Sequence, residues 1–152
     1  MAGAVPLLIE LKDQSLTLTD TDGRLENATA FELESYSGPA ALMSFNPYSI
    51  LQMARILPNV PRGLTTSAYG EDCAPLPQAT RDRLREIPDY DRTFSSFISH
   101  EAADLARPRV ADLRLQGARI LCWTIRSPKA EAEARQFAEN ITFEGYTPAF
   151  PA

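Results

Sequence analysis

The chain has 152 residues, 44% of them hydrophobic and 23% charged, and a formal net charge of −5 at pH 7. These values exclude a wholly disordered chain, and the length allows one domain with a sizeable core. The acidic balance argues against nucleic acid as a partner, because no basic stripe could release counterions from a phosphate backbone. No apolar run approaches the roughly 18 residues of a membrane span, and the first thirty residues lack the profile of a signal peptide. The cytoplasm is therefore the default location.

Short apolar runs alternate with helical stretches along the chain. The apolar runs, each predicted as a strand, begin near Leu7, Ala41, Gly63, Phe97, Ala118 and Ile141. The predicted helices between them span residues 25–36, 48–57, 78–85, 109–116 and 128–139. Continuous apolar strands separated by helices are typical of parallel strands covered by helices. The sequence therefore predicts an α/β fold with six strands, three quarters of an eight-stranded barrel.

Two predicted helix ends carry clear local signals. Gly38 and Pro39 follow the first helix, as expected at a C-terminus, and Ser127 precedes Pro128 as an N-cap before a first-turn proline. The least regular stretch, residues 68–91, follows the third strand and contains one glycine and three prolines. In a barrel such a loop lies on the active-site face, so it is a candidate substrate lid or a plain surface insertion.

The first strand ends in a charged pair. The apolar run from Val5 to Ile9 is followed by Glu10, Leu11 and Lys12, and on a strand this spacing puts Glu10 and Lys12 on one face. A carboxylate that can ligate a hard cation, beside an ammonium that can meet an anionic oxygen, suits chemistry on a phosphate ester. The alternative is a solvated ion pair at a strand end.

Cys73 lies in a proline-rich loop and Cys122 inside an apolar strand. This pair forms neither a disulfide framework nor a metal-ligand spacing, so a loop thiol and a core thiol are expected.

Three further segments have a recognisable order. They are residues 40–47, which end in Ser44-Phe45-Asn46-Pro47, then Pro61-Arg62-Gly63-Leu64, and residues 120–125, which contain Trp123-Thr124-Ile125. Together with Glu10-x-Lys12 they follow the order and approximate spacing of the E-x-K, S-F, P-x-G-L and W-T-V motifs of glycerophosphodiester phosphodiesterases. The chain resembles that family over nearly its whole length. The resemblance implies a TIM-type barrel that hydrolyses glycerophosphodiesters to glycerol 3-phosphate and an alcohol, in lipid metabolism, with a divalent metal and two histidines.

The family also carries H-R, E-x-D and H-D motifs before E-x-K, whereas nine residues precede Glu10 here. Residues 1–152 therefore resemble the C-terminal portion of the domain, with about six of eight βα units and without the N-terminal strands. We expect this chain alone to be inactive, with the missing N-terminal segment as its partner in cis or in trans. The alternative is a non-catalytic remnant that binds anions or acts as a scaffold. A periplasmic location is possible for the full-length parent.

The resemblance also implies site residues. It makes Glu10 the third carboxylate of a site for Mg²⁺ or Ca²⁺, and Lys12 a contact to the phosphate or a support for the carboxylates. Trp123 and Phe45 are either core side chains or walls of the substrate pocket, with the indole on the glycerol side. We treat both as candidate substrate-binding residues and name no catalytic residue in this chain.

Chemistry in such barrels lies at the carboxyl ends of the strands, so the candidate residues and His100 are expected to converge on one rim. His100 is the only histidine, and its usual pKa would suit a general base. Because the family's acid and base histidines precede Glu10, we expect a polar rim residue or a structural histidine instead. Lys12, Arg62 or a metal would offset the acidic surface for an anionic substrate. Two open sheet edges also predict self-association.

Overall fold

A computed structural model describes residues 5–73 and 75–148. Six strands form one sheet in the order β1-β2-β3-β4-β5-β6, and every neighbouring pair is parallel. The strands are β1 Leu7–Glu10, β2 Ala40–Ser44, β3 Arg62–Thr66, β4 Phe97–Glu101, β5 Arg119–Ile125 and β6 Asn140–Phe143. The predicted strands and their parallel arrangement are confirmed.

Five α-helices connect the strands. They are α1 Arg24–Glu34, α2 Pro47–Ile56, α3 Gln78–Arg85, α4 Pro108–Leu115 and α5 Pro128–Ala134, with short 3-10 helices η1 Glu71–Cys73 and η2 Ala102–Asp104. The bounds of α3 are those predicted. The last helix is shorter than predicted, because the Glu139 amide already donates to the Ile120 carbonyl at 2.8 Å. Residue 139 lies just before β6, and the chain has left the helix before it.

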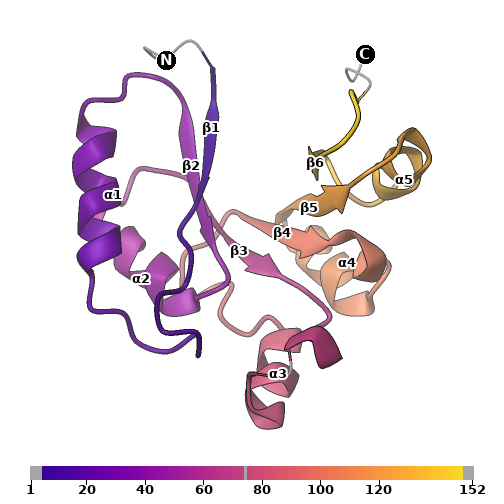
Figure 1. Cartoon of the computed structure of the whole chain (residues 1–152), viewed down its shortest axis with the longest axis horizontal. Coiled ribbons are helices and arrows are strands. Elements are labelled where there is room, and N and C mark those ends of the chain that lie inside the picture. The colour runs from indigo at the N-terminus through magenta and orange to yellow at the C-terminus, as the bar shows by residue number, and fades with distance from the viewer. Residues whose placement is uncertain (1–4, 74, 149–152) are drawn as a thin grey trace.

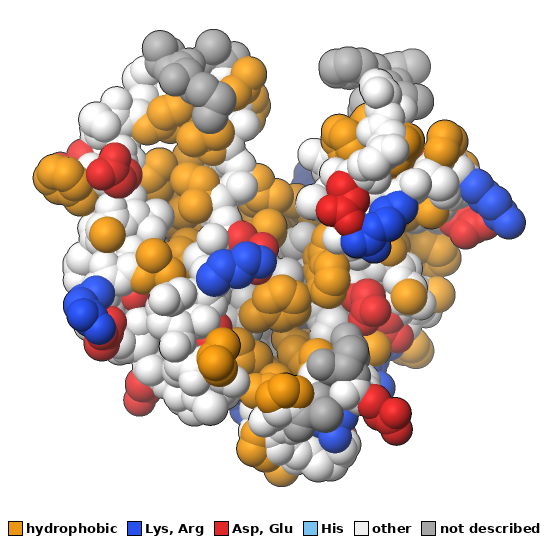
Figure 2. Space-filling view, in the orientation of Figure 1, with side chains coloured by type: hydrophobic (Ala, Val, Ile, Leu, Met, Phe, Trp, Pro, Cys, Tyr) orange, Lys and Arg blue, Asp and Glu red, His pale blue; other side chains and the backbone are white. Residues whose placement is uncertain are grey.

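The sheet is curled, with α1, α2, α4 and α5 on its convex side, α3 beyond the end of β3, and an opening between β1 and β6 (Figure 1). The rings of Phe45 and Trp123 lie 5.5 Å apart. Phe45 directly follows β2 and Trp123 belongs to β5, and β3 and β4 lie between these two strands. Neighbouring strands are about 4.8 Å apart, so a flat sheet could not bring these rings together. Figure 2 shows hydrophobic side chains on the walls of the opening. The fold is an incomplete TIM-type barrel.

The main core lies between the sheet and the helices. Leu64, Ile98 and Ile120 are at most 4% exposed and belong to one buried cluster with side chains of α4 and α5. Residues that alternate with them point to the concave side. There Gly63 allows close packing, since a Cβ at this position would lie 2.4 Å from the Phe97 ring.

Other local predictions are also tested by the fold. The Ser127 hydroxyl accepts a hydrogen bond from the Ala130 amide at 3.2 Å, with Pro128 in the first turn, which confirms this helix start. Cys122 is buried in the core and Cys73 is partly buried in its loop, and neither forms a disulfide, as expected. Within residues 5–73 and 75–148, no helix has the length and apolar character to cross a membrane.

Candidate functional site

The Glu10 and Lys12 side chains project from the concave face at the carboxyl end of β1. Ile9 and Leu11 pack into the cluster beneath α1 and α2, so the residues that alternate with them face the other way. Lys12 Nζ lies 2.8 Å from Glu10 Oε1, with the two side chains 72% and 21% exposed. The prediction that both lie on one face is confirmed.

The Glu10 carboxylate is the candidate metal ligand. Its Oε1 atom is shielded from solvent and has the Lys12 ammonium 2.8 Å away as its ion-pair partner. Carboxylate oxygens suit a hard divalent cation. Among the described residues, however, no cluster of three or more His, Cys, Asp or Glu side chains could hold a metal ion. From the described part of the chain, Glu10 therefore offers one ligand to a site that needs several.

Phe45 and Trp123 meet on the concave face. Their rings pack edge to face, with an interplanar angle of 78°. Trp123 Nε1 donates to the Ser99 carbonyl at 3.0 Å, which fixes the indole over β4. The structure thus brings together the two aromatic candidates, and a role in substrate binding stays a prediction.

His100 does not reach this rim, and the expectation that it would converge there is wrong. It is fully buried, its Nδ1 lies 2.8 Å from Thr66 Oγ1, and its Nε2 lies 3.3 Å from Asp104 Oδ2. Burial lowers the pKa of His100, although Asp104 and Glu101 oppose this shift. The physical reason for its position is the alternation of β4, since Ile98 faces the helices and His100 is two residues further.

The same alternation places three polar residues on the concave face that the sequence reasoning did not name. Thr65 and Ser99 are direct neighbours on β3 and β4, and both hydroxyl oxygens are buried without a hydrogen-bond partner among the described residues. Glu101 Oε2 accepts a hydrogen bond from the Ala68 amide at 3.0 Å. All three lie an odd number of residues after Leu64 or Ile98, so the alternation of a strand assigns them to the face opposite these core residues.

Arg62 is unavailable to an anionic substrate, contrary to expectation. Arg62 is only 6% exposed. It is the first residue of β3 and therefore lies at the opposite end of the strand from the rim. The guanidinium donates to the carbonyls of Leu57, Pro58 and Val60 at 2.6 to 3.0 Å. Burial lowers the pKa of Arg62. Arg62 therefore stabilises the turn before β3. Of the two basic residues considered for an anionic substrate, Lys12 is the one at the rim.

Asp13 anchors the loop between β1 and α1. It accepts hydrogen bonds from Asn46 Nδ2 at 2.7 Å, from Ser15 Oγ at 2.9 Å and from the Leu18 amide at 3.2 Å. Burial alone would raise the pKa of Asp13, but these hydrogen bonds outweigh it and lower the pKa below its usual value. The loop is therefore held in one shape against the start of α2.

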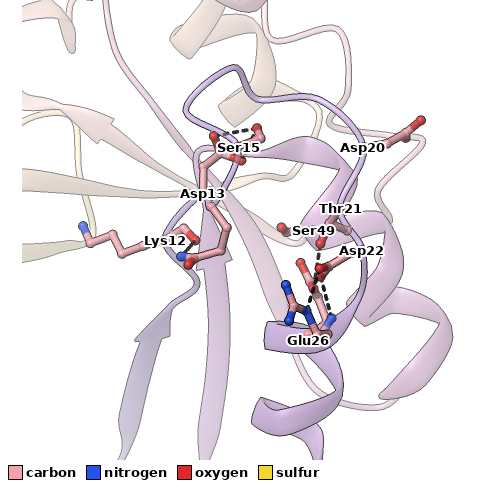
Figure 3. A pocket seen from close by; sticks show the side chains of 10 residues that line it. Lys12, Asp13, Ser15, Asp20, Thr21, Asp22, Glu26 and Ser49 are labelled. Carbon is pink, nitrogen blue, oxygen red and sulfur yellow. Dashed lines mark hydrogen bonds and ion pairs between the residues drawn. The ribbon is translucent and has the colours of Figure 1, made fainter.

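A polar hollow of about 270 Å³ lies on the helix side of this loop, with Asp20, Asp22 and Glu26 among its lining residues. Figure 3 shows Lys12 extending away from Asp22 and Glu26. Asp22 pairs with Arg24 at 2.7 Å, and Glu26 accepts from Thr21 at 2.9 Å. The surplus of carboxylates disfavours an anion in this hollow, so the phosphate-binding capacity of Lys12 belongs to the concave side.

Comparisons with solved structures agree in fold. A phosphodiesterase of Oleispira antarctica, solved with the product sn-glycerol-3-phosphate, matches 77% of this chain and 44% of its own, with 18% identity and a TM-score of 0.58. A glycerophosphodiester phosphodiesterase of Parabacteroides distasonis matches 91% of this chain and 52% of its own, with 16% identity and a TM-score of 0.63. A Silicibacter pomeroyi protein named for the same enzyme class matches 92% of this chain and 47% of its own, with 18% identity and a TM-score of 0.71.

The chain spans about half the length of these solved structures. No protein-family model matches the sequence, and no curated protein matches it. The chain therefore resembles the glycerophosphodiester phosphodiesterases in fold.

Proposed function

We propose that this chain is the C-terminal portion of a metal-dependent glycerophosphodiester phosphodiesterase, which releases glycerol 3-phosphate and an alcohol in lipid metabolism. The observation that supports this most is the Glu10–Lys12 pair, which lies at the carboxyl end of a concave-facing strand in a half barrel. Ligands and catalytic groups in TIM barrels gather at that end. A cytoplasmic location remains the default prediction.

Each candidate residue has a proposed role that follows from its chemistry. Glu10 would hold the divalent metal, which supplies Lewis-acid stabilisation of charge on the phosphoryl oxygens when bound. Lys12 would contact a phosphate oxygen, because its exposed ammonium is free to turn from Glu10 toward a ligand. Phe45 and Trp123 would form the wall along the glycerol moiety.

The chain as it stands should be inactive. Phosphodiester hydrolysis needs positioned acid and base groups, each worth roughly 10²- to 10⁴-fold. The only histidine of the sequence is buried on the helix side of the sheet, and burial lowers its pKa. The partner we propose is a segment with the remaining barrel strands, which would pair with the edges of β1 and β6. Without it, these open edges favour self-association.

The test is release of glycerol 3-phosphate from glycerophosphocholine with Mg²⁺ or Ca²⁺. We expect the purified 152-residue chain to match a no-enzyme control. We expect activity when a two-strand segment with H-R, E-x-D and H-D motifs is added in cis or as a second polypeptide. Turnover by the short chain that is lost in His100→Gln would contradict the proposal. A completed, folded barrel that neither hydrolyses nor binds the diester would favour a scaffold role.

A further inference from the structure

Glu101 lies at the rim, at the last position of β4, and has no part in the chemistry proposed above. Its Oε2 atom accepts a hydrogen bond from the Ala68 amide at 3.0 Å. Ala68 belongs to the loop that leaves β3, so this bond joins the loop of one strand to the end of its neighbour. A backbone amide forms a stronger hydrogen bond with a carboxylate than with a neutral oxygen. Glu101 is therefore a strong anchor for the loop after β3.

The other side of this loop is held by α3. Arg85 Nε donates to the Ala68 carbonyl at 2.7 Å, and Arg81 Nη1 donates to the Gly70 carbonyl at 2.8 Å. Arg81 and Arg85 are four residues apart, so they lie on one face of the helix and reach the same loop. The loop is thus fixed from the sheet by Glu101 and from the helix by two guanidinium groups.

Tyr69 lies between these anchored peptide groups in a conformation that its residue type disfavours. Its φ angle is 50°, in the left-handed region that non-glycine residues rarely adopt. Leu16 and Leu18, in the loop after β1, are also left-handed, with φ angles of 59° and 55°. Strained conformations persist where the surrounding structure enforces them, and they gather at functional sites. At Tyr69 the hydrogen bonds of Ala68 and Gly70 provide that enforcement.

The Tyr69 side chain connects this loop to the candidate site. It is buried in a cluster with two leucines, against which Phe45 packs. Phe45 in turn contacts the Trp123 ring edge to face. Tyr69 and Phe45 line one cavity together with Glu10 and Lys12. The position of the loop therefore sets the position of the aromatic wall beside the ion pair.

We propose that Glu101 is a positioning residue of the proposed enzyme. By holding the Ala68 amide it keeps Tyr69 left-handed, and Tyr69 then holds Phe45 in the wall beside the substrate. This inference rests on the proposed function and adds a residue that acts through the loop and not on the phosphate. The loop needs an acceptor oxygen at this position, which glutamine also supplies. Glu101→Gln should therefore keep most of the effect, and Glu101→Ala should lose it.

Hydrogen exchange of the 152-residue chain, followed by NMR, tests the anchor without a substrate. In Glu101→Ala we expect the Ala68 amide to exchange at least about tenfold faster than in the wild type, because it loses its acceptor. Glu101→Gln should stay within about threefold of the wild type. Glu86→Ala is the matched control, because this 63% exposed carboxylate pairs with Arg107 at the end of α3. Equal exchange in Glu101→Ala and in the control would overturn the anchor.

The single tryptophan reports whether release of the loop moves the wall. Trp123 lies against Phe45, so displacement of Phe45 should expose the indole and shift its fluorescence to longer wavelength. We expect this shift in Glu101→Ala and not in Glu101→Gln. Circular dichroism checks the fold, and Arg85→Met, which frees the Ala68 carbonyl, should give the same shift if Glu101→Ala does not fold. Faster exchange without a fluorescence shift would show a loop anchor that positions nothing, and would overturn the proposal.

Kinetics of the completed barrel separate this inference from the proposed function. Glu101→Ala should raise KM for glycerophosphocholine about fivefold and change kcat less than about twofold, because a displaced wall weakens ground-state and transition-state binding alike. A loss confined to kcat would mean that Glu101 acts on the reaction itself, and would overturn the positioning role. A folded, completed wild-type barrel without activity would overturn the proposed function, while the substrate-free measurements would still decide whether Glu101 positions the wall.

Discussion

Glu10 and His100 both stand near the carboxyl ends of strands, yet the sheet presents them to opposite environments. Glu10 and its partner Lys12 face the concave side, where the ammonium is largely exposed and lies 2.8 Å from one carboxylate oxygen. His100 faces the helices, is 0% exposed, and has a partner at each ring nitrogen. The residue type with the more suitable pKa for catalysis is therefore the one without access to a substrate.

The difference lies in access: a side chain whose partners are all supplied by the fold is occupied, whereas an exposed one can still bind a ligand. The His100 ring is satisfied by Thr66 and Asp104, so it contributes to stability. In the Glu10–Lys12 pair the ammonium is 72% exposed and can still reach a ligand. Four predictions test whether the rim acts on ligands and whether the His100 network supports the fold.

The largest effect is expected at Glu10. In a complete barrel that contains this sequence, Glu10→Gln should lower turnover by about 10² or more, because a removed metal ligand costs several kcal/mol of charge stabilisation. Steady-state kinetics across a metal titration gives the measurement. The stability should change by less than about 0.5 kcal/mol, as for most surface substitutions. Wild-type activity and metal response in this variant would remove Glu10 from the site.

His100→Ala should affect folding instead. The change leaves Thr66 Oγ1 without its imidazole partner and opens a cavity beneath the helices, so we expect a loss of about 2 kcal/mol in the free energy of unfolding. Urea denaturation of the 152-residue chain measures it, with Lys12→Met as a control expected within about 0.5 kcal/mol. A neutral result at His100 would show that the network does not support the fold.

Lys12→Met should weaken recognition of the phosphate. Methionine keeps much of the side-chain length and removes the charge, so in the complete barrel we expect kcat/KM to fall roughly tenfold, about 1.4 kcal/mol, mostly through KM. Lys12→Arg should restore part of the loss, because it returns a cation to the same position. Kinetic constants that are unchanged in Lys12→Met would leave the ion pair as a solvated strand end.

The smallest effect is a pH dependence of stability. Because the folded state lowers the pKa of His100 below 6.5, the unfolded chain binds the proton more readily. The stability from the neutral ring is complete above pH 6.5 and declines as the pH falls toward the folded pKa. From pH 7 to 5.5 we expect a loss of up to about 1 kcal/mol that His100→Gln removes. If the wild-type chain and His100→Gln lose the same free energy of unfolding between pH 7 and 5.5, this prediction is wrong.

Much of the fold could be predicted from the sequence, because it depends on local patterns. The alternation of apolar runs gave the strands, the bounds of α3 were predicted residue by residue, and the spacing of Glu10 and Lys12 placed them on one face. The same period of two predicts the orientation of His100 once Ile98 is taken as a core residue. We expected His100 at the rim because it lies near the end of a strand and is a histidine. That reasoning did not consider which face of the strand it occupies.

Other parts of the site depend on contacts between distant residues. Asp13 and Asn46 are 33 positions apart, and their hydrogen bond shapes the loop that presents Leu16. The left-handed backbone at Leu16 and Leu18 is unfavourable for these residue types, so no local propensity indicates it. Arg62 likewise donates to carbonyls of the turn before β3, and the residue types of that turn do not predict its geometry.

Asn46 also bears on how the molecule ages chemically. Its side-chain oxygen caps α2 at the Tyr48 amide, while its nitrogen donates to Asp13 and to the Thr19 carbonyl. Deamidation to aspartate would keep the cap but replace both donated bonds with repulsion between oxygens. The usual route to deamidation requires attack by the backbone nitrogen of the next residue, which is Pro47 and has no N–H. The proline that begins α2 therefore also preserves the amide that holds the rim loop in place.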